Sequence, residues 1–159
     1  MPNPRDIIFE EIYQKAISDK NVIVITIDMG AWKFQDFQKN IPDQFYNIGI
    51  CEQSAISIAS GLSLANKKVY VYAISCFPVL RAFEQIKIDI CSMNRPVTII
   101  GMGTGYGYSS DGPTHHIIED VSLMRTLPNL EIWSLSDCNG IKAAIETSYI
   151  LNKYNIPPL

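Results

Sequence analysis

Three short, continuous apolar runs constrain the fold of this chain more than any other feature of its sequence. They are VIVITI at 22–27, VYVYAI at 69–74 and VTIIG at 97–101. Each run contains β-branched residues and is too short for a typical helix. Strands that are buried on both faces carry such continuous apolar sequence, because helices cover both sides of a parallel sheet. The three runs therefore predict the interior of a mainly parallel sheet.

Helical segments are expected between these strands. Residues 5–19 place Ile8, Ile12 and Ala16 four positions apart, which is the spacing of one helix face. The full set of predicted helices covers 5–19, 32–37, 52–65, 78–92, 118–126 and 138–152. A short strand is indicated at 45–48, and a further strand is predicted at 130–134.

The alternation of strands and helices predicts the fold class and the domain organisation. Repeated βα units indicate an α/β protein, a three-layer sandwich with a mainly parallel sheet. We expect residues 1–159 to form a single domain, because the length is ordinary for one and no repeat or linker interrupts it. The tail at 154–159 resembles the approach to another strand. We therefore expect either an excised domain or an unusually short chain.

Composition narrows the classes of function. The net charge of −3 gives no electrostatic reason to expect binding to nucleic acid or to an anionic membrane. No apolar run reaches 18 residues and no secretory leader opens the chain. The four cysteines are widely spaced and contain no CxxC pair, which is typical of reduced thiols in a cytoplasmic protein.

Two loops predict a shared ligand site. One is Gly49–Gln53, with Glu52 at the start of a helix, and the other is Ser109–His116, which holds both histidines of the chain. Each loop follows a strand signal and precedes a helix signal, so both are expected at the carboxyl edge of the sheet, where ligands bind. Glu52 alone has two interpretations. It either stabilises a helix N-terminus through the dipole, or it is a buried carboxylate that binds a basic ring nitrogen of a ligand.

The glycine-rich stretch at 101–116 does not carry a familiar nucleotide or metal signature. Gly101, Gly103 and Gly105 alternate, but no helix opens directly after them, so we discount a dinucleotide site. The Walker pattern is also missing. The adjacent His115 and His116 diverge in direction on strands and helices alike, and one metal ion rarely takes both. We therefore predict no metal site within this chain.

Several segments resemble the pyrimidine-binding domain of transketolases, the central domain of a thiamine-diphosphate enzyme. The similarity runs in order from about Val22 to Ala144. The segments are FYNIGICEQSAISIASGLSLA, YAISCF and SSDGPTHHIIEDVSLMRTLPNLEIWSLSD. The DGPTH segment followed by E-D-x-x-x-x-R-x-x-P-N is quite specific to the group. This resemblance implies the thiamine-diphosphate-binding pyrimidine-domain fold.

The resemblance implies roles for residues on the cofactor side of the site. In the family, the glutamate at the position of Glu52 contacts the ring nitrogen of the aminopyrimidine and so helps to activate the cofactor. Phe77 and Leu80 match aromatic or apolar residues that pack on the pyrimidine ring, although apolar residues three apart are more often core. Asp28 matches an acidic residue near the cofactor.

The resemblance also implies a substrate side. Asp111 and His115 match residues that hold sugar hydroxyls, and the histidine assists proton transfer. His116 stands where transketolases often have glutamine, and it is given no role. Asp111–His115 reads DGPTH, whereas 1-deoxyxylulose-5-phosphate synthases usually have DGATH, so Pro113 favours transketolase.

A missing motif implies that this chain carries half of a site. In the family, Mg²⁺ and the diphosphate are held through a GDG motif, and the chain contains none. A separate diphosphate-binding domain or subunit, or a removed remainder of the same polypeptide, is therefore expected to supply the rest, together with the family's C-terminal domain. The chain alone is expected to be inactive. The small residues of helix 52–65 allow close packing against another subunit or against its own sheet. A homodimer or a heterotetramer with the partner is the corresponding hypothesis.

Three functions follow as expectations. The first is the pyrimidine-binding half of a transketolase-like enzyme that moves a two-carbon ketol unit between phosphosugars. The second is a domain of another thiamine-diphosphate enzyme, such as a 1-deoxyxylulose-5-phosphate synthase relative. The third is a non-catalytic assembly domain, against which Glu52, Asp111 and His115 argue.

Overall fold

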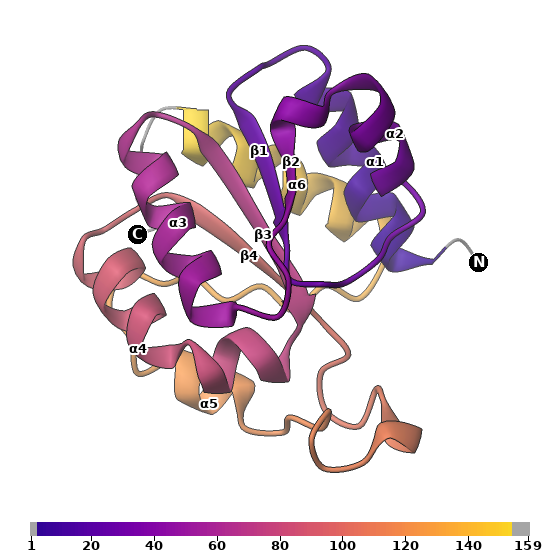
Figure 1. The fold of residues 1–159 in the computed structure, drawn as a ribbon. Coiled ribbons are helices and arrows are strands. Elements are labelled where there is room, and N and C mark those ends of the chain that lie inside the picture. The colour runs from indigo at the N-terminus through magenta and orange to yellow at the C-terminus, as the bar shows by residue number, and fades with distance from the viewer. Residues whose placement is uncertain (1–2, 154–159) are drawn as a thin grey trace.

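A four-stranded parallel sheet forms the centre of the molecule (Figure 1). The structure, a computed structural model, describes residues 3–153, so the tail at 154–159 lies outside the described residues. The strands run in the order β2-β1-β3-β4, and all three neighbouring pairs are parallel. Their bounds are β1 Val22–Thr26, β2 Phe45–Asn47, β3 Lys68–Ile74 and β4 Val97–Met102. The predicted α/β class with a parallel sheet is confirmed.

Helices cover both faces of the sheet and complete the three-layer sandwich (Figure 1). One face packs against α1 Pro4–Ala16, α2 Phe34–Asn40 and α6 Cys138–Lys153. The other packs against α3 Glu52–Leu64, the helical segment 77–92 and α5 Asp120–Met124. Short 3₁₀ turns span Pro42–Gln44 and Ser109–Asp111. Between residues 3 and 153, no helix is long and apolar enough to cross a bilayer.

The alternation of side chains along the central strands explains why both faces need a helical layer. In β3, Val69 and Val71 point into the core that contains α3, whereas Tyr70 and Tyr72 point into the core that contains α1 and α6. Every residue of β1 and β3 is buried. A strand with apolar side chains on both sides is stable only when both sides are covered, so the continuous apolar runs decided the layer arrangement.

The segment predicted as one helix over 78–92 is irregular. It consists of π-helical turns at Phe77–Arg81 and Ile86–Ser92, joined by α4 Phe83–Gln85. Ala82 has non-helical backbone angles, φ −116° and ψ 22°, and it separates the first π-helical turn from the rest of the segment. The helix predicted at 118–126 is also shorter, because α5 covers only Asp120–Met124. Apolar periodicity predicts which face is buried, but it does not fix how many residues each turn contains.

The strand predicted at 130–134 was wrong. Within residues 3–153 this segment joins no strand of the sheet, and β4 is left as an edge. An apolar cavity of about 790 Å³ lies beside β4, with Ile99, Leu130 and Trp133 among its lining residues. Alternating apolar and polar residues indicate that a segment could form a strand. A strand forms only where the backbone of the segment can hydrogen-bond to a neighbouring strand.

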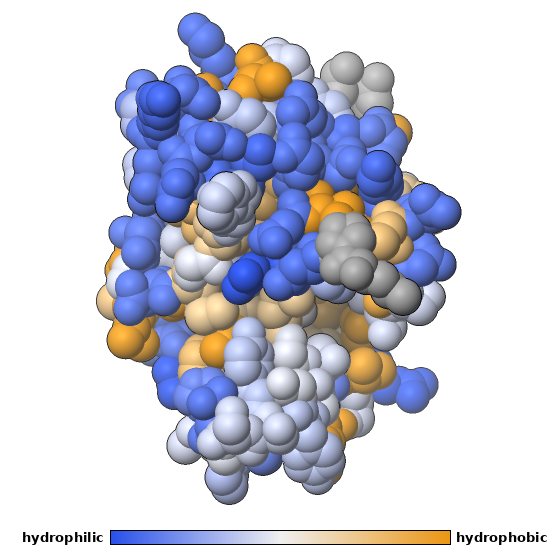
Figure 2. Space-filling view, turned by 90° about the vertical axis from the view of Figure 1, so that its right-hand side faces the viewer, coloured by the Kyte–Doolittle hydropathy of each residue, from blue (hydrophilic) through white to orange (hydrophobic). Residues whose placement is uncertain are grey.

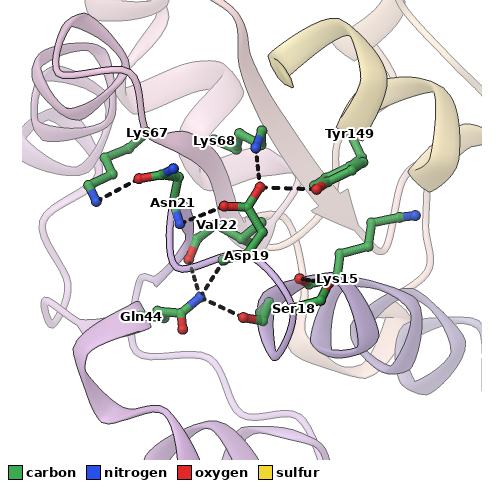
Figure 3. Close-up of polar contacts among 10 residues, drawn as sticks. Lys15, Ser18, Asp19, Asn21, Val22, Gln44, Lys67, Lys68 and Tyr149 are labelled. Atoms are coloured by element: carbon green, nitrogen blue, oxygen red, sulfur yellow. Dashed lines mark hydrogen bonds and ion pairs between the residues drawn. The ribbon is translucent and has the colours of Figure 1, made fainter. Parts of the chain in front are cut away.

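A partly buried polar cluster connects the amino ends of the strands to the helices (Figure 3). The Asp19 carboxylate accepts hydrogen bonds from Lys68 Nζ and from Tyr149 Oη, the latter at 3.0 Å. Nearby, the Gln44 amide donates to three main-chain carbonyls of residues 16–22. Burial alone would raise the pKa of Asp19, but the hydrogen bonds from Lys68, from the Asn21 N–H and from Tyr149 outweigh it and hold that pKa below its usual range. The cluster lies at the edge of the sheet opposite the carboxyl-end loops.

We expect Asp19→Asn to lower the free energy of unfolding at pH 7 by about 3 kcal/mol, because Lys68 is left buried without its counter-charge. The pKa of Asp19 is lower in the folded chain than in the unfolded one. Its contribution is therefore present above an unfolded pKa of about 4 and is lost as the pH falls through the lowered folded pKa. Urea unfolding from pH 7 to pH 2 should show a weaker acid dependence in Asp19→Asn than in wild type.

The matched control is Asp43→Asn, which removes an exposed carboxylate and should change stability by less than about 0.5 kcal/mol. Equal losses in the two variants would contradict the structural role of the Asp19 cluster.

Candidate functional site

The loops at the carboxyl ends of the strands use backbone conformations that most residues avoid. Asp28 after β1 has φ 54°, Gly49 after β2 has φ 74°, and Gly103 after β4 has φ 73°. Positive φ is uncommon for a residue other than glycine, and aspartate is among the side chains that tolerate it best. The Asp28 N–H donates to Asn47 Oδ1 at 3.2 Å, which links the ends of β1 and β2. Tight turns at this edge bring the loop residues close to the ends of the strands.

Glu52 is a buried carboxylate. It is the first residue of α3, and only 7% of its side chain is exposed. Its Oε1 accepts a hydrogen bond of 2.7 Å from Nη1 of Arg81, whose side chain is 49% exposed. The Arg81 guanidinium also covers the ring of Phe77, with Cζ 4.3 Å from the ring centroid. Glu52 therefore begins a helix and has a buried carboxylate, and its partner within the chain is Arg81.

Phe77 connects this pair to the histidine loop. The rings of Phe77 and His115 meet edge to face with their centroids 5.1 Å apart. The Nδ1 atom of His115 lies 3.0 Å from Oγ1 of Thr114. The site residues Glu52, Phe77 and His115 are spread over a sequence separation of 63 positions. A continuous series of contacts through Arg81 and Phe77 joins them. The sequence had predicted all three as site residues.

The loop that carries His115 is closed at its base. Gly105 and Ile117 exchange two backbone hydrogen bonds of 2.6 and 3.0 Å across an antiparallel bridge. The Cys76 thiol donates to the carbonyl of Thr114 at 3.5 Å, and its pKa is raised by burial, so it is a protonated donor. Figure 2 looks at the molecule from the side of this loop, which forms a lobe of intermediate hydropathy below a hydrophilic surface. The bridge holds the histidine against Phe77.

We expect Gly103→Ala to disturb this loop more than a substitution elsewhere in it. Gly103 has positive φ, and a Cβ there would lie 2.1 Å from the ring of Tyr108, which also lies near His115. The matched control is Gly105→Ala, where φ is also positive but a Cβ would meet nothing within 4 Å. Limited proteolysis should cleave the loop faster in Gly103→Ala than in Gly105→Ala, and equal rates would contradict the packing role of Gly103.

Three predicted site residues lie outside the contact chain of Glu52, Phe77 and His115. Asp111 lies in the exposed 3₁₀ turn of the loop. Asp28 is exposed at the end of β1. Leu80 is 46% exposed, next to Arg81 in the π-helical turn. All three are accessible to a ligand or to a partner, and none belongs to the apolar core.

Sequence reasoning missed Arg81. Its spacing from Phe77 is four residues, which is a signal for a contact along one helical face. Its contact with Glu52 spans 29 residues and depends on how α3 packs against the segment 77–81. Only the tertiary structure brings those two elements together.

No metal centre accompanies these residues in the part of the chain that is described. Over residues 3–153, no three His, Cys, Asp or Glu side chains gather closely enough to hold an ion.

Comparison with known families identifies this arrangement. The sequence profile described as "Transketolase, pyrimidine binding domain" matches residues 3–156. The chain belongs to the transketolase pyrimidine-binding domain family. The match confirms the resemblance seen in the Glu52 and DGPTH segments, and the transketolase fold agrees with the all-parallel sheet between two helical layers.

The relatives of this transketolase-family chain are longer proteins. It is 37% identical to one subunit of the apulose-4-phosphate transketolase of Phocaeicola vulgatus, over 77% of this chain and 40% of that protein. It is 34% identical to the subunit of the same name from Actinobacillus succinogenes, over 82% of this chain and 42% of that one. It is 31% identical to the 1-deoxy-D-xylulose-5-phosphate synthase of Nitratidesulfovibrio vulgaris, over 96% of this chain and 24% of that enzyme.

A solved structure supports the same family. The neighbour is described as a split gene transketolase, an inactive β4 tetramer, with a TM-score of 0.81 and 29% identity. The alignment covers 94% of this chain and 48% of the neighbour. The chain therefore spans less than half of the transketolase relatives that it matches, and it corresponds to their pyrimidine-binding domain.

Proposed function

We propose that this chain is the pyrimidine-binding half of a transketolase-like enzyme that transfers a two-carbon ketol unit between phosphosugars with thiamine diphosphate. The observation that carries the proposal is the buried Glu52 carboxylate at the N-terminus of α3, in contact through Arg81 and Phe77 with His115. The family match to the transketolase pyrimidine-binding domain supports the same conclusion.

The residues present fit the aminopyrimidine ring of this cofactor. A buried carboxylate suits a nitrogenous ring that shares a proton with it, because a buried charge or polar group needs a partner. An aromatic side chain beside that carboxylate suits a flat ring. Glu52 and Phe77 already hold a planar cation, the Arg81 guanidinium, in such a position.

In the proposed reaction, the chain's own groups bind, orient and move protons. Glu52 exchanges a proton at the ring nitrogen, acting as a general acid–base group through the cofactor. Phe77 and Leu80 pack on the ring, and Asp28 lies near it. The cofactor supplies the electron sink for the carbon–carbon bond that is broken and remade.

On the substrate side, we assign Asp111 and His115 to the hydroxyl groups of the sugar. His115 also assists proton transfer, and its contacts with Thr114 and Phe77 support a fixed ring orientation. The relatives named for apulose 4-phosphate make a phosphorylated ketose the favoured substrate class.

A partner is needed to complete the site. We propose that a diphosphate-binding domain or subunit holds the diphosphate and Mg²⁺, because no GDG segment occurs in this chain. The two relatives named for apulose 4-phosphate are each described as one subunit of a transketolase, which supports such a division. We place the enzyme in the cytoplasm and in carbohydrate metabolism, on the basis of its reduced cysteines and the phosphosugar relatives.

Self-association is a second part of this proposal. On α3, Ala55 and Ala59 are buried in the core against the sheet, Ser60 is buried with its hydroxyl donating to the Asp89 carbonyl, and Ser54, Ser57 and Gly61 are exposed. The inward small residues explain the close packing on the sheet, and the outward ones leave room for another subunit. The structural neighbour described as an inactive β4 tetramer supports self-association, and we propose a homodimer or a heterotetramer with the partner. Analytical ultracentrifugation showing a strict monomer at high concentration would count against it.

The decisive experiment combines this chain with a candidate diphosphate-binding subunit, thiamine diphosphate and Mg²⁺. Ketol transfer from xylulose 5-phosphate or apulose 4-phosphate should appear in the mixture and be absent from either protein alone. Lack of transfer with every GDG-containing chain that co-purifies would contradict the proposal.

The synthase relatives favour a second candidate function, because the similarity to them covers 96% of this chain. The same mixture should then form 1-deoxy-D-xylulose 5-phosphate instead of transferring a ketol unit. A non-catalytic assembly domain is the third candidate. It predicts that the partner is active without this chain.

A further inference from the structure

Arg81 contacts both side chains that the proposed cofactor ring requires. Its Nη1 donates to Glu52 Oε1 at 2.7 Å. Its Cζ lies 4.3 Å from the centroid of Phe77. Under the proposed function, Glu52 is the acceptor for the ring nitrogen and Phe77 packs against the ring. The guanidinium of the chain itself therefore fills both positions.

The guanidinium resembles the aminopyrimidine in the chemistry that matters here. Both are planar, delocalised groups that present N–H donors at an edge and a flat face to an aromatic ring. A separation of 4.3 Å between the guanidinium carbon and the Phe77 centroid is direct contact, which leaves no room for a second flat group on that face. The two groups therefore compete for one place.

We propose that Arg81 is an internal competitor for the pyrimidine site: it pairs with Glu52 and covers Phe77 in the free chain, and it must swing away before a ring can bind. This inference rests on the proposed function. The difference in exposure sets the direction of the movement, because the Arg81 side chain is 49% exposed and Glu52 only 7%. Arg81 can move into solvent on its flexible stem, whereas Glu52 is held at the start of α3.

Arg81 stabilises the free chain, but it lowers the affinity of the chain for the pyrimidine ring. Without Arg81, the buried Glu52 carboxylate has lost its observed counter-charge, which is unfavourable until a ligand or partner arrives. While Arg81 is in place, the ring can bind only during the fraction of time that Glu52 and Phe77 are free. The apparent dissociation constant is raised by the inverse of that fraction.

The test uses the full 159-residue chain and two probes, 4-amino-5-hydroxymethyl-2-methylpyrimidine and thiamine diphosphate. Arg81→Met keeps an unbranched side chain but removes the guanidinium. We expect it to bind the pyrimidine about tenfold more tightly than wild type, as if Arg81 left the site free roughly a tenth of the time. Binding is measured by NMR titration, in which the Arg81 side-chain signal of the wild type should also shift as the ring is added.

Two matched variants separate this effect from a change in net charge. Lys87→Met removes a positive charge from the neighbouring exposed part of the same helical segment and should leave affinity unchanged. Arg81→Lys keeps the charge but removes the planar guanidinium, so it should bind the pyrimidine more tightly than wild type and less tightly than Arg81→Met, because its ammonium group can still pair with Glu52. If Arg81→Met does not fold, Arg81→Gln carries the same prediction with a smaller gain, because its amide can still donate to Glu52.

The outcomes are distinct. Tighter binding in Arg81→Met but not in Lys87→Met supports the competitor. Equal or weaker binding in Arg81→Met, or no detectable binding by it at all, overturns the competitor. The proposed function is judged separately by the activity of the reconstituted enzyme. It stands if Glu52→Gln abolishes that activity, and Arg81 is then a contact of the bound ring or a purely structural partner of Glu52.

Discussion

Glu52→Gln should reduce the turnover of the reconstituted enzyme by about 10³-fold or more, within the range that general acid–base groups contribute. Glutamine keeps the size of the side chain and can still accept the hydrogen bond from Arg81 through its amide oxygen. It cannot exchange a proton with a ring nitrogen as a carboxyl group does. The variant is therefore expected to fold and to fail in chemistry, which steady-state kinetics and circular dichroism would measure together.

Glu84→Gln is the matched control. Glu84 is an exposed carboxylate in the helical segment next to Arg81, and its loss should leave turnover unchanged. Wild-type turnover in Glu52→Gln would refute the proposed role of Glu52. A loss of folded structure in that variant would assign Glu52 a mainly structural role in its pairing with Arg81.

His115→Asn is expected to lower kcat/KM by about 10²-fold, at the lower end of the effect of a proton-transfer group. The asparagine side chain retains hydrogen-bonding capacity towards Thr114, but it loses the ring contact with Phe77 and the ability to carry a proton. Initial rates over a range of ketose concentrations would show whether binding, turnover or both are affected.

The adjacent histidine provides the control for this experiment. His116 packs against Tyr106, with ring centroids 5.0 Å apart, and it is given no role in the proposed reaction. His116→Asn should therefore keep kcat/KM close to wild type. Equal losses in the two variants would show that loop packing, and not proton transfer by His115, controls the rate.

The sequence predicted the sheet better than the helices around it. The runs at 22–27, 69–74 and 97–101 all became parallel strands. The strands β1 and β3 are fully buried because helices cover both faces, whereas the edge strand β4 is only partly buried. The segment at 130–134 carries a similar local signal, yet it joins no strand among the described residues. The segment could pair only if its backbone lay beside that of β4, and local sequence does not encode this placement.

The sequence also predicted part of the candidate site, because the order of the strands determines where the loops lie. Glu52, Phe77 and His115 each follow a strand, so the topology of a parallel sheet brings their loops to one edge. Leu80 was selected from the family resemblance, whereas its apolar spacing alone favoured a core position; the chain forms a π-helical turn there and Leu80 is 46% exposed. Asp28 and Asp111 lie on exposed turns, and their proposed roles depend on what binds to this edge.

Sequence by itself determined the family, the parallel sheet and the loops that carry chemistry, because these depend on residue types and on the order of strands along the chain. The tertiary structure decided that Glu52 is buried and that Arg81 pairs with it across 29 positions while covering Phe77. The physical reason is that burial and charge pairing depend on how α3 packs against the segment 77–81, and such packing is set by the whole core and not by any local pattern.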